Sequence, residues 1–338
     1  HMTLQSSGQL NFSDITNEFG TPPNNNLGAF RVSENHGSLS NLPLDLTIPQ
    51  SGEIKFSDFY GRRLNVVVDC YSGGTETRSS ARSKYNGSQV NVIGGFRTQP
   101  SPPSGIKVII NVNKGFQSVR DNDTTKVALR TGEYGSDCLL RVDVGGSGYI
   151  GGAGGDGGNG SSGAGGGEAG SNGNSGLGIE HESSDGTTVI SNSGTISAGF
   201  GGGGGGAGAF DYDKNSSRSA SGGGGGGGAG FPAGEGGVGG TEGKDGGNGG
   251  DGGLNSAGAG GGGGNNDNEA VGGAGGSGGS DGESANNGGS SEGGEGSGSS
   301  GGAGGGDGAA IRRESGGITI SVVNNGTIRG STTATGVN

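Results

Sequence analysis

The chain has 338 residues, of which 93 are glycine, 25% are hydrophobic and 5% are aromatic. Its 20 lysine and arginine residues stand against 32 aspartate and glutamate residues, which gives a formal net charge of −12. This charge disfavours phosphate backbones and anionic lipids as partners, and no stretch approaches the roughly 18 consecutive apolar residues of a membrane span. We therefore expect no nucleic-acid binding and no membrane insertion. Most of the glycine lies between residues 148 and 308, so the chain is expected to combine regions of different kinds.

The first 62 residues contain a repeated motif. Residues 6–20 and 50–62 share Ser-Gly-x-[Leu/Ile]-x-Phe-Ser-Asp-[Ile/Phe]. In each copy an aliphatic residue and a phenylalanine alternate with polar residues, which predicts a short strand followed by a Ser-Asp helix cap or turn. So few apolar residues cannot form a core alone, and we expect residues 1–62 to dock onto a larger body.

Residues 63–147 are typical of a small β domain. Short β-branched runs at 64–70, 89–97, 105–113, 125–131 and 137–144 are separated by turns of glycine, proline, asparagine and serine. Even spacing of such runs predicts a sandwich or a compact sheet.

The cysteines and histidines give no reactive grouping. Cys70 and Cys138 lie far apart without a CxxC pattern, so they are either a disulfide pair or two buried thiols, and we favour thiols. The histidines, His1, His36 and His181, fall in separate regions. The sequence therefore offers no nucleophile with a base beside it and no zinc site, and we expect no enzyme.

Three related pieces bracket the glycine-rich region. Residues 144–152, 190–198 and 322–330 each fit [Val/Ile]-x-x-x-Gly-x-Ile and read as a strand ending in a turn. The first two lead directly into glycine tracts, which free linkers would not require. We therefore expect a folded glycine-rich domain at 148–310 and a strand with a tail at 311–338.

The glycine has a period of three residues. Every third position from 148 to 166 is glycine, as is every third position from 222 to 252 except Phe231. A polyproline-II-type helix has three residues per turn and no internal hydrogen bonds, so its backbone groups must find partners elsewhere. With glycine on the crowded faces, such helices can approach until the N–H of one meets the C=O of the next. This predicts a helix bundle with off-frame residues such as Asp156 and Asn248 outside and a corner at 229–234.

The glycine motifs of cofactor and metal sites do not fit. No Gly-x-Gly-x-x-Gly match follows a strand and opens a long helix, as a dinucleotide site requires. Residues 151–159 and 246–254 match the first half of a calcium-binding nonapeptide, but Gly158 and Gly253 occupy its inward apolar position. We expect neither a cofactor nor a bound metal.

Polar and aromatic interruptions of the glycine tracts are the candidate binding residues. Large aromatic residues with polar neighbours, held in loops on a rigid scaffold, often form binding surfaces. The alternative is that some of them, Phe200 and Phe231 above all, wedge helix ends apart. The candidates for binding are Phe200, Phe210, Asp211, Tyr212, Lys214, Arg218, Phe231, Asn265 and Asn266.

From "GTISAGFGGGGGG" at 194–206 and the loops between the tracts, the chain resembles the distal-tip adhesins of T-even-like bacteriophage long tail fibres. The resemblance implies a small β domain carrying a sandwich of stacked polyglycine-II helices, with distal loops that bind a host outer-membrane protein. "SGEIKFSDFYG" at 51–61 is similar to segments near the start of phage tail proteins and implies attachment to a tail fibre protein. The chain lacks the tryptophan of those adhesins' attachment regions. The candidates for fibre attachment are Leu10, Phe12, Ile54, Phe56, Phe59 and Tyr60.

Two other functions fit a glycine-rich chain. Small antifreeze proteins also use polyglycine-II bundles, but ice binding needs a flat and sparsely charged face, which the acidic residues of the tracts disfavour. A structural tail protein with a flexible glycine spacer is the other alternative.

Overall fold

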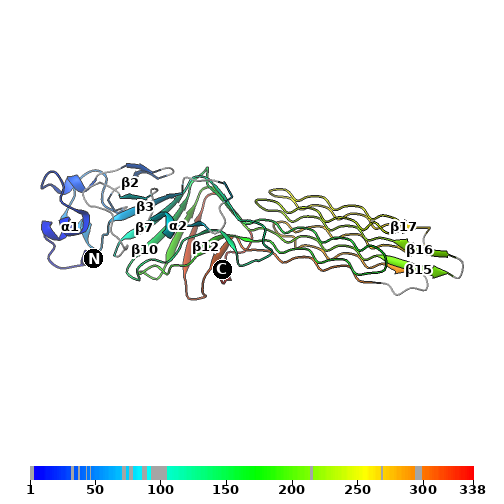
Figure 1. Ribbon diagram of the computed structural model, residues 1–338. Helices are drawn as coiled ribbons and strands as arrows, with labels where there is room; N and C mark the ends of the chain where they lie inside the picture. The colour runs from blue at the N-terminus through cyan, green and yellow to red at the C-terminus, as the bar shows by residue number, and fades with distance from the viewer. Residues whose placement is uncertain are drawn as a thin grey trace.

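The computed structural model describes residues 4–31, 34–36, 39–42, 44–45, 47–70, 74–75, 79–85, 90–92, 105–213, 216–267, 269–293 and 299–338. The molecule is elongated (Figure 1). The N-terminal segment lies at one end, a set of β-sheets lies in the middle, and the glycine-rich region extends to the other end. No helix among the described residues is long and apolar enough to cross a membrane.

The N-terminal segment contains short helices, α1 (Phe12–Phe19), η1 (Leu27–Arg31) and η2 (Phe56–Phe59), and a hairpin of β1 (Glu34–His36) and β2 (Leu39–Leu42). Both copies of the repeated motif begin a helix at their phenylalanine. In each copy the aspartate carboxylate turns back to the chain before the helix, where Asp14 accepts the N–H of Asn11 at 2.8 Å and Asp58 that of Lys55 at 2.7 Å. The predicted strands at Leu10–Phe12 and Ile54–Phe56 were therefore wrong. The helix-capping hydrogen bonds of the aspartate outweigh the strand preference of only two alternating apolar residues.

This segment packs on the outer face of the neighbouring sheet. A single apolar cluster joins Leu10, Phe19, Phe30 and Phe59 to Val67 and Ile109 of the sheet. Leu10 and Phe59, predicted to attach the fibre, are buried in this cluster, so they hold the segment to its own chain. Phe12, Ile54 and Tyr60 are partly buried against it, and Phe56 is 41% exposed.

An ion pair also joins the N-terminal segment to the sheet. Lys107 Nζ lies 3.2 Å from the carboxylate of the buried Asp45. Burial alone would raise the pKa of Asp45, but Lys107, the N–H of Arg63 and the Thr47 hydrogen bonds together hold that pKa below its usual value. The charged carboxylate is therefore the form that the folded junction favours.

The middle of the molecule is built from three sheets that the chain visits in turn. Among the described residues their strands are parallel, except that the edge strand β6 (Val90–Val92) pairs antiparallel with its neighbour. The 6-stranded sheet has the order β21 (Ile320–Asn324), β13 (Thr188–Asn192), β10 (Leu139–Val144), β7 (Lys107–Val112), β3 (Asn65–Cys70) and β6 (Val90–Val92). The second sheet has the order β22 (Thr327–Arg329), β14 (Thr195–Ser197), β11 (Tyr149–Gly151), β8 (Gly115–Gln117) and β4 (Gly74–Thr75). The third has the order β23 (Ala334–Thr335), β20 (Ile311–Arg313), β12 (Ser175–Ile179), β9 (Val127–Arg130) and β5 (Ser79–Ser80). We call this three-sided body the solenoid, because each coil of the chain places one strand in each sheet.

The solenoid has an apolar interior. Alternate residues of the strands, such as Val66, Ile110 and Val142, point inward and form one buried cluster with Cys70 and Cys138. Both cysteines are free thiols, as favoured from the sequence. Helix α2 (Ala81–Tyr85) brings Tyr85 into the same cluster. The predicted arrangement, a sandwich or a compact sheet, was wrong, because the short runs stack in parallel register as successive coils of three sheets.

Strands from distant parts of the sequence complete the solenoid. β12, β13 and β14 follow one glycine tract, β20 to β23 follow the rest, and all lie in the same three sheets as β3, β4 and β5. The sheets therefore extend across the boundaries expected at residues 147 and 310. The glycine-rich region leaves the solenoid between β11 and β12 and again between β14 and β20.

Residues 152–174, 199–208, 221–264, 272–291 and 299–308 form what we call the glycine lattice, a set of extended segments side by side (Figure 1). Hydrogen bonds between backbones link the segments, and consecutive residues donate to different neighbours. Three consecutive bonds illustrate the pattern: Gly202 to Ser171 at 2.9 Å, Gly203 to Gly226 at 2.8 Å and Gly204 to Asn286 at 3.0 Å. Each register repeats three residues later, as in the bond from Gly206 to Gly223.

Two segments, 199–208 and 221–230, lie inside the lattice. Their backbones donate to three neighbouring segments and accept from others, and their residues are buried. A Cβ built on Gly225 would lie 2.0 Å from the carbonyl oxygen of Gly203, and one on Gly203 would lie 2.1 Å from that of Gly276. Runs of consecutive glycine occur here because every side of these segments meets another backbone.

Polar side chains complete the hydrogen bonds at the surface of the lattice. Asp156 and Asn159 accept the N–H groups of Glu235 and Val238, at 2.8 and 2.9 Å. Asp251 accepts the N–H of Gly236 at 2.9 Å. The outward positions expected for these side chains are confirmed, and their role as acceptors for neighbouring segments is a further finding.

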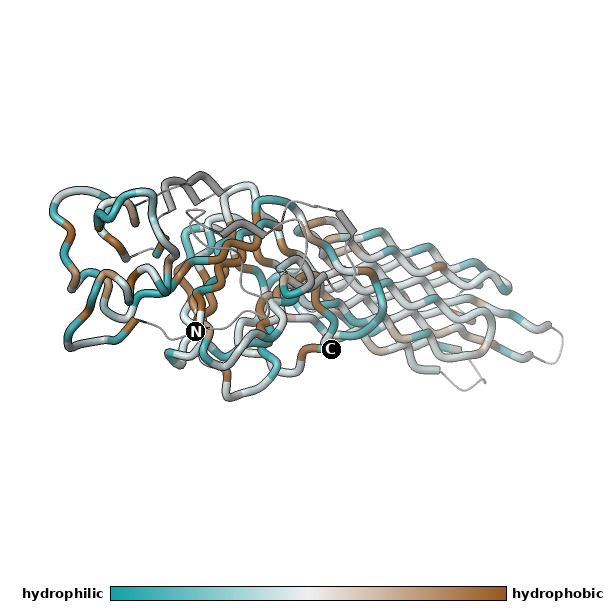
Figure 2. Tube along the Cα trace, turned by 60° about the vertical axis from the view of Figure 1, so that its left-hand side comes forward, coloured by the Kyte–Doolittle hydropathy of each residue, from teal (hydrophilic) through white to brown (hydrophobic). Residues whose placement is uncertain are grey.

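Hydropathy separates the two bodies (Figure 2). Hydrophobic residues gather in the N-terminal segment and the solenoid, whereas the lattice is pale to hydrophilic along its whole length. The solenoid therefore has a core of side chains, and the lattice has a core of backbone.

Candidate functional site

The end of the lattice farthest from the N-terminus carries small antiparallel sheets (Figure 1). The hairpin of β15 (Ala209–Asp213) and β16 (Ser216–Ala220) joins the two central segments. Beside it lies a sheet of β17 (Asn265–Asn266), β18 (Ala270–Val271) and β19 (Glu292–Gly293). We call the described residues 209–213, 216–220, 241–245, 265–267 and 269–271 the distal surface.

The inner face of the hairpin packs on this second sheet. Ala209 pairs with Ala220 across the hairpin, and both are buried with Ala270 of β18. Side chains two residues further along a strand lie on the same face, so the paired residues Asp211 and Arg218 continue it. The inner face is therefore apolar at the base of the hairpin and charged nearer to the hairpin turn.

The outer face of the hairpin carries the aromatic residues. Phe210 and Tyr212 are two positions apart on β15, and their rings stack with centroids 6.5 Å apart at an angle of 25°. Phe210 is partly exposed, and Tyr212 is 70% exposed. Stacked rings with this exposure form an amphipathic contact surface of the kind that binding loops use.

The inner face is tied to the loop at 265–271 by charge. Arg218 Nη1 lies 2.5 Å from Glu269 Oε2 and 3.9 Å from Asp267 Oδ2. The Arg218 side chain is 32% exposed, against 53% for Glu269 and 79% for Asp267. The guanidinium thus lies between the hairpin and the loop.

Backbone contacts anchor the base of the hairpin. The carbonyl of Ser219 accepts the N–H of Lys244 at 3.1 Å and the Asn266 side-chain amide at 3.3 Å. The hydroxyl of Ser221 donates to the Glu242 carbonyl at 2.8 Å and accepts the Glu242 N–H at 2.9 Å. The turn at 241–245 and the loop at 265–271 therefore hold the base of the hairpin.

Most of the residues predicted from the sequence to bind a receptor meet at this surface. The hairpin carries Phe210, Asp211, Tyr212 and Arg218, and β17 beside it carries Asn265 and Asn266. Lys214 lies outside the described residues. The structure thus brings together residues from two interruptions of the glycine tracts.

Phe200 and Phe231 lie elsewhere. Phe200 is 5% exposed and packs with Ala198 and Ala229 where the lattice meets the solenoid. Phe231 packs edge-on against Tyr149 of β11, with ring centroids 4.8 Å apart. These contacts match the alternative in which both residues wedge the ends of segments, so neither belongs to the distal surface.

Sequence reasoning missed the turn at 241–245, which supplies Glu242 and Lys244. Glycine occupies Gly240, Gly243 and Gly246, so the three-residue period continues through the turn and hides it. Gly243 has a φ of 76°, a left-handed conformation that glycine adopts without strain. In this turn, the glycine at the periodic position allows the chain to reverse its direction.

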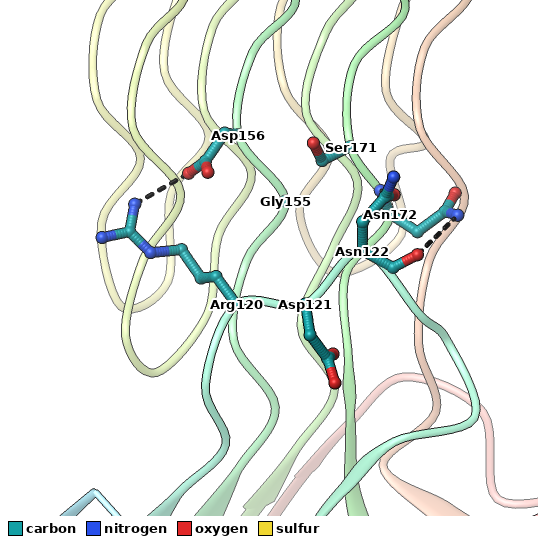
Figure 3. Close-up of a pocket in the computed structure, with 7 residues that line it drawn as sticks. All are labelled: Arg120, Asp121, Asn122, Gly155, Asp156, Ser171 and Asn172. Atoms are coloured by element: carbon teal, nitrogen blue, oxygen red, sulfur yellow. Dashed lines mark hydrogen bonds and ion pairs between the residues drawn. The ribbon is translucent and has the colours of Figure 1, made fainter. Parts of the chain in front are cut away.

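A hollow of about 230 Å³ lies where the lattice meets the solenoid, at the end away from the distal surface (Figure 3). It is lined by Arg120, Asp121, Asn122, Gly155, Asp156, Ser171 and Asn172. Arg120 is bound to Asp156 at 2.7 Å and Glu235 at 2.6 Å, and these bonds raise its pKa. The Asn172 N–H donates to Asn122 Oδ1 at 2.6 Å. These groups bind one another around the hollow, and their bonds join the solenoid to the lattice.

No group of three or more His, Cys, Asp or Glu within the described part of the chain is placed to hold a metal ion. The sequence model of the family described as "Phage tail fibre adhesin Gp38" matches residues 76–333. The match covers most of the chain, from the first coil of the solenoid through the lattice to the last coil. The chain therefore belongs to this family of non-enzymatic, receptor-binding proteins of the phage tail fibre tip.

A solved structure of the gp37–gp38 adhesin tip complex of the bacteriophage S16 long tail fibre is also similar to the chain. The identity is 19%, the alignment covers 96% of this chain and 99% of that chain, and the TM-score is 0.32. None of the curated proteins matches the sequence.

Proposed function

We propose that the glycine lattice is a polyglycine-II sandwich that serves as a rigid scaffold for the distal surface. Its bonding supports the assignment, because consecutive residues donate to different neighbours and each register repeats after three residues. The buried segments 199–208 and 221–230 run directly into the hairpin. A scaffold that fixes both ends of the hairpin limits the freedom lost when the hairpin binds a partner.

The outer face of this hairpin is the proposed receptor contact. The single observation that carries the proposal is the exposed, stacked pair of Phe210 and Tyr212 at the end of the molecule farthest from the N-terminus. Membership of the adhesin family makes a host-surface molecule the expected ligand. We propose an outer-membrane protein of the host as the ligand, contacted by the aromatic pair on the outer face of the hairpin.

The N-terminal segment is the proposed attachment to the tail fibre protein. Of the residues predicted for this role, Phe56 is exposed, and Phe12, Ile54 and Tyr60 are partly buried around the cluster that holds the segment to the solenoid. This segment lies at the opposite end from the distal surface (Figure 1). Attachment there leaves the hairpin directed away from the fibre.

Replacement of the aromatic pair tests the receptor contact. In the variant carrying Phe210→Ala and Tyr212→Ala, binding of the purified chain to host cells should fall by about 100-fold, since truncation of binding-site aromatics typically removes about 2 kcal/mol or more. The matched control is Phe56→Ala, an exposed aromatic at the other end of the molecule, which should leave cell binding unchanged. Unchanged binding by the double variant would mean that the hairpin is not the contact.

A further inference from the structure

The distal hairpin is held in two different ways along its length. At its base, buried alanines and the hydrogen bonds to the Ser219 carbonyl fix it to neighbouring loops. Further toward its turn, Arg218 joins the hairpin to Glu269 and Asp267 on the loop at 265–271. This ion pair links two interruptions of the glycine tracts, since Arg218 and Glu269 are 51 residues apart in sequence.

Arg218 occupies the inner face, opposite the aromatic pair. It pairs with Asp211, whereas Phe210 and Tyr212 alternate with Asp211 on β15 and so point to the other face. Its side chain is 32% exposed and already bound at 2.5 Å to a carboxylate. A guanidinium in this position is suited to holding the hairpin against the loop, while the opposite face remains free for a partner.

We propose that Arg218 is a positioning residue for receptor recognition. By binding Glu269, it sets the angle of the hairpin against the loop at 265–271 and so fixes how Phe210 and Tyr212 are presented, without itself touching the receptor. This inference rests on the proposed function of the distal surface. Receptor specificity is then a joint property of the hairpin and the loop.

The energetics of exposed ion pairs give this role a recognisable signature. Such a pair contributes little to folding stability, because both charges are well solvated outside the pair. Its loss frees the hairpin, and a partner must then order the hairpin at the moment of binding. Disruption should therefore weaken binding and leave the melting temperature almost unchanged.

Charge exchange across the pair is the test. Arg218→Glu and Glu269→Arg should each weaken binding of the full chain to host cells by about tenfold, because each places like charges together and releases the hairpin. The variant with both changes restores opposite charges and should bind to within about threefold of the unaltered chain. All three should melt within about 2 °C of it.

Two further variants make the outcomes distinguishable. Glu283→Arg makes the same charge change as Glu269→Arg in an exposed turn at the solenoid end of the lattice, and it should leave binding unchanged. Tyr212→Ala reports on the contact surface itself and should weaken binding.

Different results would overturn the two proposals separately. If both single charge variants weaken binding and the exchanged pair does not restore it, Arg218 contacts the receptor and does not act by positioning. If Tyr212→Ala weakens binding and Arg218→Glu does not, the positioning role fails while the contact surface stands. If Tyr212→Ala and Phe210→Ala both leave binding unchanged, the proposed function fails and the positioning role fails with it.

Discussion

The solenoid and the glycine lattice both have a packed core, but the solenoid forms it from side chains and the lattice forms it from backbone. In the solenoid, β-branched side chains fill the space between three sheets, and the backbone hydrogen bonds join neighbouring strands within each sheet. In the lattice, backbone bonds run outward in several directions from each central segment, and the few interior side chains, such as Ala207 and Ala229, are mostly small. The difference shows that a folded core requires close packing with satisfied hydrogen bonds, and that apolar side chains are one way to achieve it.

The two kinds of core should respond to substitution in opposite directions. The solenoid is sensitive to the removal of atoms, because a truncated side chain leaves a cavity. The lattice is sensitive to their addition, because its segments lie at backbone contact distance. The following predictions test this contrast, from the largest expected effect to the smallest.

Truncation in the solenoid core should have the largest effect. Ile110 is fully buried between Val68 and Val142 of the neighbouring strands. We expect Ile110→Ala to lower the free energy of unfolding by about 3 to 4 kcal/mol, measured by urea denaturation, and Ile110→Val to lower it by about 1 kcal/mol. Equal losses for the two variants would show that the cavity is not the cause.

Addition of one methyl group inside the lattice should come next. In Gly225→Ala the new Cβ would lie 2.0 Å from the Gly203 carbonyl oxygen, so two central segments must move apart. The expected loss in the free energy of unfolding is about 2 to 3 kcal/mol. The matched control is Gly262→Ala, because Gly262 is exposed and a Cβ there meets nothing within 4 Å. Similar losses for both glycines would contradict a core made of backbone.

Removal of a surface acceptor should have the smallest effect. Asp251 accepts the N–H of Gly236, so Asp251→Ala should lower the free energy of unfolding by about 1 kcal/mol. Asp251→Asn keeps an oxygen acceptor in the same place and should be close to neutral. If alanine and asparagine behave alike, the outward side chains only solubilise the lattice.

Much of the lattice could be predicted from glycine spacing. The three-residue period implies a three-fold helix, and a helix without internal bonds implies neighbours. The outward positions of Asp156 and Asn248 follow from the same frame. The turn at 241–245 could not be found, because Gly243 continues the period while reversing the chain.

The architecture of the solenoid was harder to predict from the sequence. Strands at 64–70, 105–113 and 137–144 were expected from their β-branched residues, but their parallel stacking depends on contacts between coils that are far apart in sequence. For the same reason, β20 to β23 could be predicted as strands in part but not assigned to the three sheets that β3, β4 and β5 begin. In the repeated motif, the residues up to the phenylalanine were misread as strand because their alternation is short. The Ser-Asp helix cap that was predicted to follow is confirmed by the bonds of Asp14 and Asp58.

The candidate site was predictable by region but not by face. Interruptions of the glycine tracts pointed to Phe210, Tyr212 and Arg218, but sequence alone did not separate the exposed aromatic face from the charged inner face. That separation depends on the pairing of Asp211 with Arg218 and on the packing of Ala209 and Ala220 against Ala270. For Phe200 the sequence left two roles open, binding residue or wedge between segment ends. Its burial against Ala198 and Ala229 at the solenoid end of its segment matches the second role.

Amide hydrogen exchange across residues 199–230 of the full chain tests the central claim most directly. Each buried N–H from Gly202 to Gly206 donates to a neighbouring segment, so these amides should exchange as slowly as those of Val108 and Ile110 in the solenoid. Exposed Gly262 should exchange quickly and serves as the reference within the same lattice. Exchange of Gly202–Gly206 at the rate of an unstructured chain would contradict the account, because the glycine-rich region would then be a flexible tether without a core.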